Sequence, residues 1–301
     1  MIEAIGLRFA YADREILKGV DFYAKRGEVV VLMGRNGAGK TTLLKHLNGL
    51  LKPKSGRVVI DGVELKYDRK SLLRARRKVL YVFQNPDDQI LAPTVWQDVA
   101  FGPKNLGLKG EELERVVREA LKAVGLEGYE NRLCSTLSGG EKRRLAIASA
   151  IAMDASYYLL DEPSANVDGE GFKTVVEVIE KLRSRGKGIV VSTHDVDLAK
   201  SVGDRFCFME DGRIVWEGES FDYSIARKLK LRSFALGKII VADKPIDSYE
   251  CFYEPEKALL RALEGKTVVL IGEADGIERY PVEIVYEEHE GRGRGSRVLE
   301  A

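Results

Sequence analysis

Nine residues near the amino terminus have the composition and spacing of a phosphate-binding loop. They read Gly-Arg-Asn-Gly-Ala-Gly-Lys-Thr-Thr and match the pattern G-x-x-x-x-G-K-[ST]. Glycines let the backbone wrap closely around a phosphate, and amides at the start of a helix add positive dipole ends. Lys40 would supply a point charge to the β- and γ-phosphates, and the Thr41 hydroxyl would ligate Mg²⁺. The residues expected to bind the nucleotide here are Gly34, Asn36, Gly37, Ala38, Gly39, Lys40, Thr41 and Thr42.

Two adjacent acids, Asp161 and Glu162, end an apolar run that starts at Tyr157. Acids at the carboxyl end of a strand lie in the crevice where an open α/β sheet binds its ligand. Asp161 would hold Mg²⁺ directly or through a bound water, and Glu162 would orient and deprotonate an attacking water. A strand-end acid pair is often merely solvated, but the phosphate loop upstream favours a catalytic function.

Two further polar residues follow apolar runs of the same kind. His194 comes after Gly188 to Thr193, and Gln84 comes after Val79 to Phe83. Residues that follow neighbouring parallel strands meet at one edge of the sheet, so both side chains would reach the same crevice. His194 would reach the γ-phosphate.

The elements that must position these residues alternate between strand and helix, which predicts an α/β sheet. Asp211-Gly212 between two short apolar runs predicts a β-hairpin. Strands are expected over Glu28 to Met33, Arg57 to Ile60, Val79 to Phe83, Tyr157 to Leu160 and Gly188 to Thr193, and helices over Thr41 to Leu50 and around Phe172 to Leu182.

Changes in composition and in the spacing of apolar residues along the chain predict the domain organisation. Polar, Pro-containing sequence and then apolar residues at helical spacing indicate a mainly helical insertion over about residues 85–140. A small appended domain is expected over 223–301, after a main domain over 1–222, with strands at Val268 to Ile271 and Val282 to Tyr286 and a helix at Glu256 to Leu263. The glycine- and arginine-rich tail, 290–301, is expected to be a flexible terminus rather than an RNA-binding segment.

Composition and charge exclude several classes of protein. A chain of 301 residues with 45% hydrophobic residues can build a sizeable core, which excludes general disorder. A formal net charge of +1 gives no reason to expect nucleic acid as a partner. No apolar run approaches the roughly 18 residues of a membrane span, and no secretory signal is visible. The scattered cysteines Cys134, Cys207 and Cys251 predict reduced thiols in a cytoplasmic protein.

A third motif identifies the family. Residues Leu137 to Arg144 read Leu-Ser-Gly-Gly-Glu-Lys-Arg-Arg. With the phosphate loop, Gln84, Asp161-Glu162, Asp168 and His194 in this order, the chain resembles the ATP-binding cassette (ABC) ATPases over about residues 1–220. The resemblance implies a P-loop NTPase cassette of the α/β class, with a RecA-like core, an antiparallel β subdomain and a helical subdomain, followed by a small C-terminal α+β extension. It also implies ATP as substrate and Mg²⁺ as cofactor.

The resemblance gives roles to residues that would serve the chain's own ATP. Tyr11 would stack on adenine. Gln84 would contact Mg²⁺ and the attacking water, and its loop would sense a membrane partner. Glu162 would be the catalytic base, and His194 would hold the γ-phosphate and the water. Thr41, Gln84 and Asp161 would form the Mg²⁺ site.

Other residues would act on a second subunit. In the family that the chain resembles, the segment corresponding to Ser138, Gly139, Gly140 and Glu141 clamps the γ-phosphate held by the other chain of a dimer. Glu141 stands where Gln is commoner, and this change removes no group that hydrolysis needs. Asp168 resembles the aspartate of a loop that crosses the dimer interface. A homodimer or a heterodimer with a similar chain would complete two sites.

One stretch points to a branch of the family. Gln84 to Leu91 reads Gln-Asn-Pro-Asp-Asp-Gln-Ile-Leu, and this stretch with Asp98 to Leu108 is similar to the ATPases of energy-coupling-factor (ECF) importers, including the cobalt and nickel type. That similarity implies a transmembrane coupling protein and a small membrane protein that captures a vitamin or metal ion. The chain would then lie peripherally on the cytoplasmic face of the membrane, and its C-terminal extension would help it pair. Large apolar residues here would form a partner groove or local core: Ile90, Leu91, Val95, Trp96 and Phe101.

Two other functions stay open at this point. The chain would alternatively serve another type of ABC transporter, or be a soluble ABC ATPase outside transport. Soluble types usually carry a long coiled coil or a second cassette, and the sequence has neither. A non-catalytic subunit would be expected to lack Glu162 or His194, and both are present. The transported substrate is left open as well.

Overall fold

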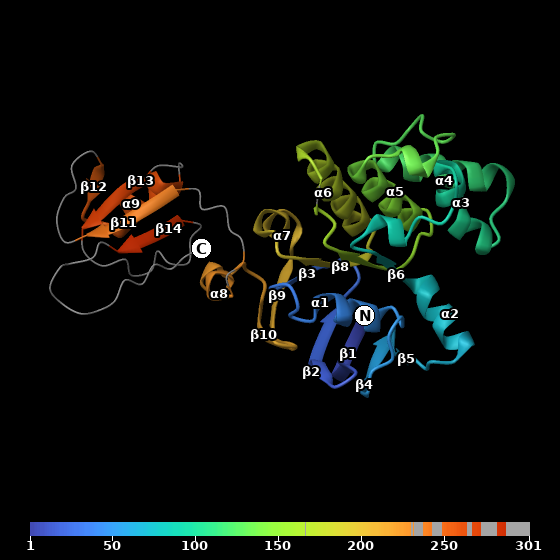
Figure 1. The fold of residues 1–301 in the computed structure, drawn as a ribbon, viewed down its shortest axis with the longest axis horizontal. Coiled ribbons are helices and arrows are strands. Elements are labelled where there is room, and N and C mark those ends of the chain that lie inside the picture. Colours follow the sequence, from blue (N-terminus) through green and yellow to red (C-terminus); the bar gives the residue numbers. More distant parts are fainter. Residues whose placement is uncertain are drawn as a thin grey trace. The chain divides into compact units, whose positions relative to one another are not determined.

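The chain is divided into two compact units (Figure 1). Unit 1 comprises Met1–His194 and Leu198–Ser220, and unit 2 comprises Asp195–Asp197 and Phe221–Ala301. The computed structural model describes residues 1–165, 167–229, 231, 237–242, 249–263, 267–271 and 282–286. The tail at 290–301, which the sequence predicts to be flexible, lies outside the described residues.

A six-stranded sheet forms the centre of unit 1. Its strands are β3 (Val29–Met33), β6 (Val79–Val82), β7 (Tyr157–Asp161), β8 (Gly188–Thr193), β9 (Arg205–Glu210) and β10 (Arg213–Gly218). The strand order is β10-β9-β3-β8-β7-β6, and every pairing is parallel except that of β10 with β9. Every residue of β3, β7 and β8 is buried, because a parallel sheet is covered on both faces. The carboxyl ends of β3, β7 and β8 therefore lie side by side.

An antiparallel sheet covers one side of this core. Its strands are β1 (Ile2–Tyr11), β2 (Arg14–Ala24), β4 (Ser55–Ile60) and β5 (Val63–Glu64), in the order β2-β1-β4-β5. Helix α1 (Lys40–Leu47) lies between the two sheets (Figure 1). Its buried Leu43 and Leu44 belong to one apolar core with Ile2 and Leu7 of β1. This packing fixes the start of α1 at the edge of the six-stranded sheet.

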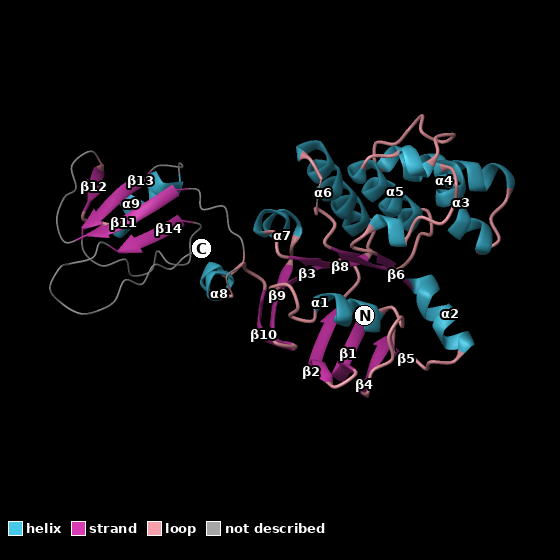
Figure 2. Cartoon of the chain, in the orientation of Figure 1, coloured by secondary structure: helices cyan, strands magenta, loops and turns pink. Residues whose placement is uncertain are grey.

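Helices gather on the opposite side of the six-stranded sheet (Figure 2). They are α3 (Val95–Asn105), α4 (Gly110–Ala123), α5 (Gly139–Ile151) and α6 (Gly169–Ser184). Side chains fix the starts of α3, α5 and α6 by accepting hydrogen bonds from otherwise unpaired backbone amides. These side chains belong to Thr94, Ser138 and Asp168. Residues 85–140 hold α3, α4 and the short 3₁₀ helices η1 (Pro86–Asp88) and η2 (Cys134–Thr136).

Unit 2 contains a smaller parallel sheet. Its elements are α8 (Tyr223–Lys228), β11 (Gly237–Ala242), β12 (Glu250–Phe252), α9 (Pro255–Leu263), β13 (Thr267–Ile271) and β14 (Val282–Tyr286), and the strand order is β12-β13-β11-β14. Ala258 and Leu259 of α9 form an apolar core with Ile239, Val268 and Leu270 of the sheet. The strands and the helix expected here from the sequence are confirmed.

Sequence patterns missed some elements of unit 1. Helix α2 (Arg69–Lys78) was not predicted, because only Ser71 and Ala75 are buried and its sequence carries no apolar stripe. Its one local signal is Asp68, whose side chain accepts hydrogen bonds from two amides at the helix start. Strands β1 and β2 were also missed, because irregular register interrupts the alternation that marks a strand. The hairpin of β9 and β10 is confirmed.

An ionic cluster around Asp61 joins the two sheets of unit 1. Its carboxylate accepts hydrogen bonds from Arg26 at 2.8 Å, Lys78 at 2.9 Å, the Tyr157 hydroxyl at 2.7 Å and the Met1 amino group at 3.1 Å. Burial by itself raises the pKa of Asp61, but these donors outweigh burial and hold that pKa well below its usual value. Because Tyr157 belongs to β7, the cluster links the antiparallel sheet to the central sheet.

Replacing Asp61 by Asn is expected to lower the free energy of unfolding of unit 1 by about 2 kcal/mol at neutral pH, because charge-assisted hydrogen bonds are lost. The folded-state pKa lies below the unfolded-state value, so this stabilisation is complete above about pH 5 and is lost as the pH falls through the folded-state pKa. Urea unfolding followed by the fluorescence of Trp96 and Trp216, both in unit 1, measures the difference.

The matched control is Asp211→Asn, which removes an exposed carboxylate that pairs with Lys18. A smaller effect is expected there because solvent screens an exposed pair. Equal destabilisation by the two changes would contradict the structural role of the Asp61 cluster. A loss of unfolding free energy in Asp61→Asn that persists in acid would contradict it as well.

Candidate nucleotide-binding site

A cavity of about 440 Å³ lies where β3 is joined to α1. The residues that line it are Tyr11, Arg14, Ile16, Arg35, Asn36, Gly37, Gly39, Lys40, Thr41, Thr42, Gln84 and Glu162. The fold thus brings Gln84 and Glu162 to the phosphate loop from distant parts of the sequence. Two other predicted residues, Gly34 and Ala38, belong to the loop but are not among the lining residues.

The backbone of the loop requires glycine at two positions. A Cβ on Gly34 would collide with the backbone carbonyl oxygen of Met209 in the neighbouring strand β9. Gly39 has a φ of 107° and directly precedes α1, a conformation that other residues rarely adopt. These glycines let the loop turn tightly, so that the first amides of α1 face the cavity as an anion-binding helix start.

Lys40 is held inside the loop. Its ammonium group donates to the carbonyl oxygen of Gly34 at 2.6 Å, and its Nζ lies 3.6 Å from Oε1 of Glu162. Burial lowers the pKa of Lys40, while the charges of Glu162 and Asp161 oppose that shift. The loop therefore fixes the position of a buried cation that a bound phosphate would neutralise.

Glu162 is fixed at the end of β7 by several contacts. Its amide donates to the carbonyl oxygen of Ser192 at 2.8 Å, and its φ of 48° is unusual for a residue other than glycine. Its Oε2 lies 2.9 Å from Nδ1 of His194 and accepts a hydrogen bond from the Thr193 hydroxyl at 3.2 Å. The structure thus places a carboxylate and an imidazole together beside the phosphate loop, as general-base chemistry requires.

Asp161 lies next to the expected metal ligand of the loop. The Thr41 hydroxyl donates to Oδ2 of Asp161 at 2.8 Å, and the Tyr81 hydroxyl donates to the same oxygen at 2.7 Å. Burial, together with the Asp161 charge, raises the pKa of Tyr81, so this hydroxyl remains a donor. Hydroxyl and carboxylate oxygens side by side are the ligands that Mg²⁺ prefers, so the donor set fits the ion that the family resemblance implies.

Gln84 begins a loop that is anchored at two points. Gln89 accepts a hydrogen bond from the Phe83 amide at 3.0 Å and donates to the carbonyl oxygen of Ala146 in α5 at 2.7 Å. Asp98 of α3 accepts hydrogen bonds from the Leu91 amide at 2.8 Å and from the Ser149 hydroxyl, also at 2.8 Å. The loop that carries Gln84 is therefore tied to two helices, and a displacement of either helix would act on it.

The segment from Ser138 to Glu141 begins α5 and does not contribute to the cavity lining. The Ser138 hydroxyl accepts from the Glu141 amide at 3.3 Å, and the Glu141 carboxylate accepts from the Ser138 amide at 2.7 Å. A Cβ on Gly139 or Gly140 would meet no atom within 4 Å in the described part of the chain. Packing against the described residues of this chain therefore does not require either glycine.

Of two other predicted residues, Tyr11 lies at the rim of the site and Asp168 does not line it. Tyr11 lines the rim of the cavity with 49% of its surface exposed, and its ring packs edge-on against Phe9. The exposed ring is free to stack on a planar base. Asp168 begins α6, where its side chain accepts a hydrogen bond from the Gly171 amide at 2.7 Å. It is not among the residues that line the cavity.

Sequence reasoning missed several residues of the site. Tyr81 and Ser192 stand inside apolar strands, and Arg143 stands inside α5. Arg143 is buried and donates to the carbonyl oxygens of Phe83 at 3.2 Å and Ala165 at 3.5 Å, so it links α5 to the loops that follow β6 and β7. For Tyr81 and Ser192 a polar residue in an otherwise apolar strand was the available signal, but it does not identify the partner. Arg143 stands in the charged run from Glu141 to Arg144, which gives no sign that it is buried.

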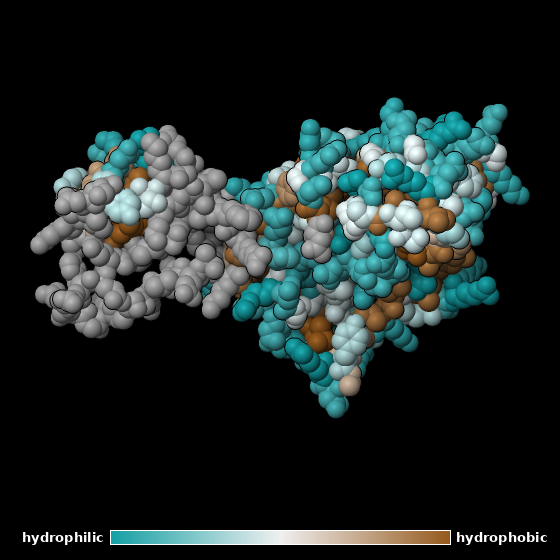
Figure 3. Space-filling model, turned by 45° about the horizontal axis from the view of Figure 1, so that its top comes forward, coloured by the Kyte–Doolittle hydropathy of each residue, from teal (hydrophilic) through white to brown (hydrophobic). Residues whose placement is uncertain are grey.

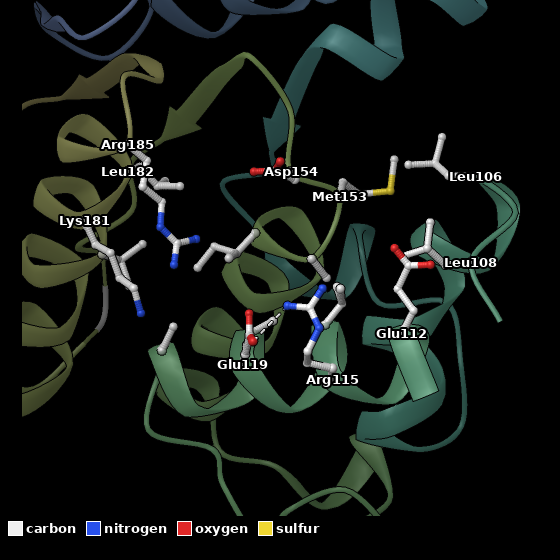
Figure 4. Close-up of a pocket in the computed structure, with 16 residues that line it drawn as sticks. Leu106, Leu108, Glu112, Arg115, Glu119, Met153, Asp154, Lys181, Leu182 and Arg185 are labelled. Atoms are coloured by element: carbon white, nitrogen blue, oxygen red, sulfur yellow. Dashed lines mark hydrogen bonds and ion pairs between the residues drawn. The ribbon is translucent and has the colours of Figure 1, made fainter. Parts of the chain in front are cut away.

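A second hollow, of about 380 Å³, lies among α4, the end of α5 and α6 (Figure 4). Apolar side chains such as Leu106 and Leu182 are mixed there with charged ones, and Arg115 pairs with Glu119 at 3.0 Å. Leu106 and Leu108 belong to the segment that is similar to ECF ATPases, but none of the residues predicted to bind ATP or Mg²⁺, or to act on a second subunit, lines this hollow. The chemistry expected from the sequence is therefore concentrated at the phosphate loop.

Comparisons with known proteins agree with this geometry. The ABC transporter family profile matches residues 17–165. A protein of Archaeoglobus fulgidus named as an ABC transporter ATP-binding protein is 70% identical over 290 residues, which cover 94% of this chain and 99% of that protein. The energy-coupling factor transporter ATP-binding protein EcfA of Methanocaldococcus jannaschii is 50% identical over 237 residues, which cover 77% of this chain and 85% of that protein.

Two solved structures have the same fold. Clostridium perfringens cbiO1, described as part of the ABC transporter complex cbiONQ, matches with a TM-score of 0.66 and 36% identity over 72% of this chain and 88% of its own. The cassette MJ0796, solved as a dimer in a post-hydrolysis state with ADP and Pi, matches with a TM-score of 0.67 and 31% identity over 73% of this chain and 100% of its own.

The fold and the phosphate site define a P-loop ATPase with the cassette architecture, and the expected fold class is confirmed. The chain belongs to the ATP-binding proteins of ABC transporters. It is an ATPase subunit of such a transporter. The similar cassette MJ0796 was solved as a dimer bound to ADP and Pi. Among the described residues, the helices are too short or too polar to cross a bilayer.

Proposed function

We propose that this chain is the ATP-hydrolysing subunit of an ECF-type importer for a vitamin or a transition-metal ion of the cobalt and nickel class. The observation that carries the proposal is the 50% identity to an EcfA protein over most of both chains. The likeness to cbiO1, part of a cbiONQ complex, supports the same branch. The segment from Gln84 to Leu91, similar to ECF ATPases in sequence, forms the loop anchored by Gln89 and Asp98.

The arrangement of side chains supports one course for hydrolysis. The loop amides and Lys40 bind the β- and γ-phosphates, and Thr41 and Asp161 hold Mg²⁺, with Gln84 from the facing loop. The ion, when bound, neutralises the charge that builds up on the phosphates. Glu162 accepts the proton of the attacking water, and His194, in contact with Glu162, orients that water against the γ-phosphate.

A second copy of the cassette would complete each site. Ser138, Gly139 and Gly140 lie outside the cavity of their own chain, and packing against its described residues requires neither glycine. Amides at the start of α5 would bind the γ-phosphate held by a partner chain. ATP would then join two cassettes, and hydrolysis would release them, which supplies the opening and closing motion that drives transport.

The surface near the Gln84 loop supports docking of a membrane subunit. Leu91 is 70% exposed and Phe101 is 51% exposed, whereas Val95 is fully buried and belongs to the local core. Apolar surface is visible at the end of unit 1 where Figure 1 draws α2, α3 and α4 (Figure 3). Contiguous exposed apolar surface is a feature of interaction sites. Docking here would reach the ATP site through the anchored loop.

The deciding experiment is an affinity purification of the tagged chain from detergent-solubilised native membranes, with mass spectrometry of the proteins that accompany it. A multi-span coupling protein and a small integral membrane protein are expected, and the small partner would reveal the substrate. A second, similar ATPase would show a heterodimer. Recovery only from the soluble fraction, with ribosomes, DNA or assembly factors, would refute the transport role.

A double variant, Leu91→Ser with Phe101→Ser, is expected to reduce recovery of the membrane partners by at least about tenfold, since burial of two large apolar side chains is worth a few kcal/mol and each 1.4 kcal/mol is about a factor of ten. ATP binding by the purified chain should be unchanged, because neither residue lines the cavity. Val215→Ser in β10 is the matched control, since Val215 is 49% exposed and lies outside the helices of the proposed docking surface. Equal loss of partners from the control would place the docking surface elsewhere.

A further inference from the structure

Tyr81 and Ser192 hold the Asp161 carboxylate from two neighbouring strands. Strands β6 and β8 both pair with β7, which ends at Asp161. The Tyr81 hydroxyl donates to Oδ2 at 2.7 Å, and the Ser192 hydroxyl donates to Oδ1 at 2.6 Å. The exposed fractions of Tyr81, Ser192 and Asp161 are 8%, 0% and 1%. Water therefore offers little competition for these bonds, and they determine how the carboxylate is oriented.

The third bond to this carboxylate is of a different kind. The Thr41 hydroxyl donates to Oδ2 at 2.8 Å, and Thr41 also lines the nucleotide cavity. A hydroxyl oxygen can ligate a cation through a lone pair while its hydrogen is still donated to a carboxylate, so Thr41 can act as a ligand from this position. Tyr81 and Ser192 do not line the cavity. The hydrogen bonds from Tyr81 and Ser192 to Asp161 can therefore remain in place when Thr41 binds a cation.

We propose that Tyr81 and Ser192 are positioning residues that orient Asp161 for a divalent cation bound together with ATP. This inference rests on the proposed function of the site and adds two residues that act only through Asp161. Partners in the outer shell of a metal site orient its carboxylate ligands and raise metal affinity. Loss of either hydroxyl weakens cation binding, while the phosphate loop, which contacts neither hydroxyl, binds the nucleotide as before.

The test compares Tyr81→Phe and Ser192→Ala in the full chain with the unchanged protein. Binding of Mn²⁺ in the presence of ATP is measured by electron paramagnetic resonance, and binding of ATP in excess EDTA is measured separately by calorimetry. Each variant is expected to weaken Mn²⁺ binding about tenfold, as is typical for an outer-shell partner. The ATP affinity in EDTA should not change, which distinguishes positioning of the carboxylate from a general structural role.

The matched control is Tyr67→Phe. The Tyr67 hydroxyl is buried and has no hydrogen-bond partner in the described part of the chain, so the control removes the same group from a residue that does not line the nucleotide cavity. Tyr81→Phe keeps the ring that packs edge-on against Phe83. If that variant nevertheless failed to fold, Ser192→Ala would decide the question through the other carboxylate oxygen.

Four outcomes are informative. Weaker Mn²⁺ binding with unchanged metal-free ATP binding supports the proposal. Mn²⁺ binding equal to that of Tyr67→Phe, or an equal loss of metal-free ATP affinity, overturns it. Failure of the unchanged protein to bind ATP at all would instead overturn the proposed function of the site, so the two failures are distinguishable.

Discussion

Replacing Glu162 by Gln is expected to lower the rate of ATP hydrolysis by about a hundredfold or more, because a positioned general base contributes a factor of roughly 10² to 10⁴. The amide keeps the size of the side chain but does not accept the proton of the attacking water. ATP binding should be retained, since Asp161 and the loop amides remain in place around Lys40. The ATP-bound dimer should therefore accumulate, which size-exclusion chromatography with ATP would detect beside a phosphate-release assay.

The control for this change is Glu177→Gln in α6, an exposed acid that pairs with Lys173 on the surface. It removes the same charge far from the cavity, so hydrolysis should be unaffected. Normal turnover by the Glu162→Gln variant would refute the assignment of Glu162 as the base. Loss of ATP binding in that variant would show instead that the contact of Glu162 with Lys40 is needed to hold the loop.

Replacing Gly139 by Asp is expected to reduce hydrolysis by about a hundredfold, the usual cost of disabling one group that stabilises the developing charge. The new carboxylate would stand at the start of α5 and repel the triphosphate of the partner chain. Folding should be unaffected, since a Cβ on Gly139 meets no atom within 4 Å in the described part of the chain. Each chain should still bind ATP, because Gly139 does not line its own cavity.

Lys109→Asp is the control, because it places a new carboxylate at the start of another helix, α4. Mixing is the decisive measurement. In a homodimer, Gly139→Asp and Lys40→Ala chains together form one intact site, so the mixture should recover up to about a quarter of the normal rate if pairing is random. Inactivity of the mixture would favour pairing with a different ATPase chain, and full activity of Gly139→Asp alone would remove this segment from the site.

The sequence by itself determined the class of the protein, because its chemistry is carried by local patterns. The phosphate loop needs Gly34, Gly39 and Lys40 at fixed spacing, and the structure shows why, since the backbone approaches Met209 and turns directly into α1. Strands such as β3 and β7 are continuous apolar runs, which makes their ends, and hence the place of Asp161 and Glu162, visible in the sequence. The start of α5 is visible as well, because its capping interaction joins residues only three positions apart.

Only the tertiary structure decided which residues support that site. The bond from Tyr81 to Asp161 spans 80 positions and that from Ser192 spans 31, and no local spacing records such a pairing. Which apolar side chains are buried also depends on contacts with residues that are distant in the sequence. Val95 is buried while Leu91 and Phe101 are exposed, although all three are large apolar residues in one segment. Patterns in a sequence report the neighbours of a residue along the chain, whereas contacts between strands and helices depend on how all the elements pack together.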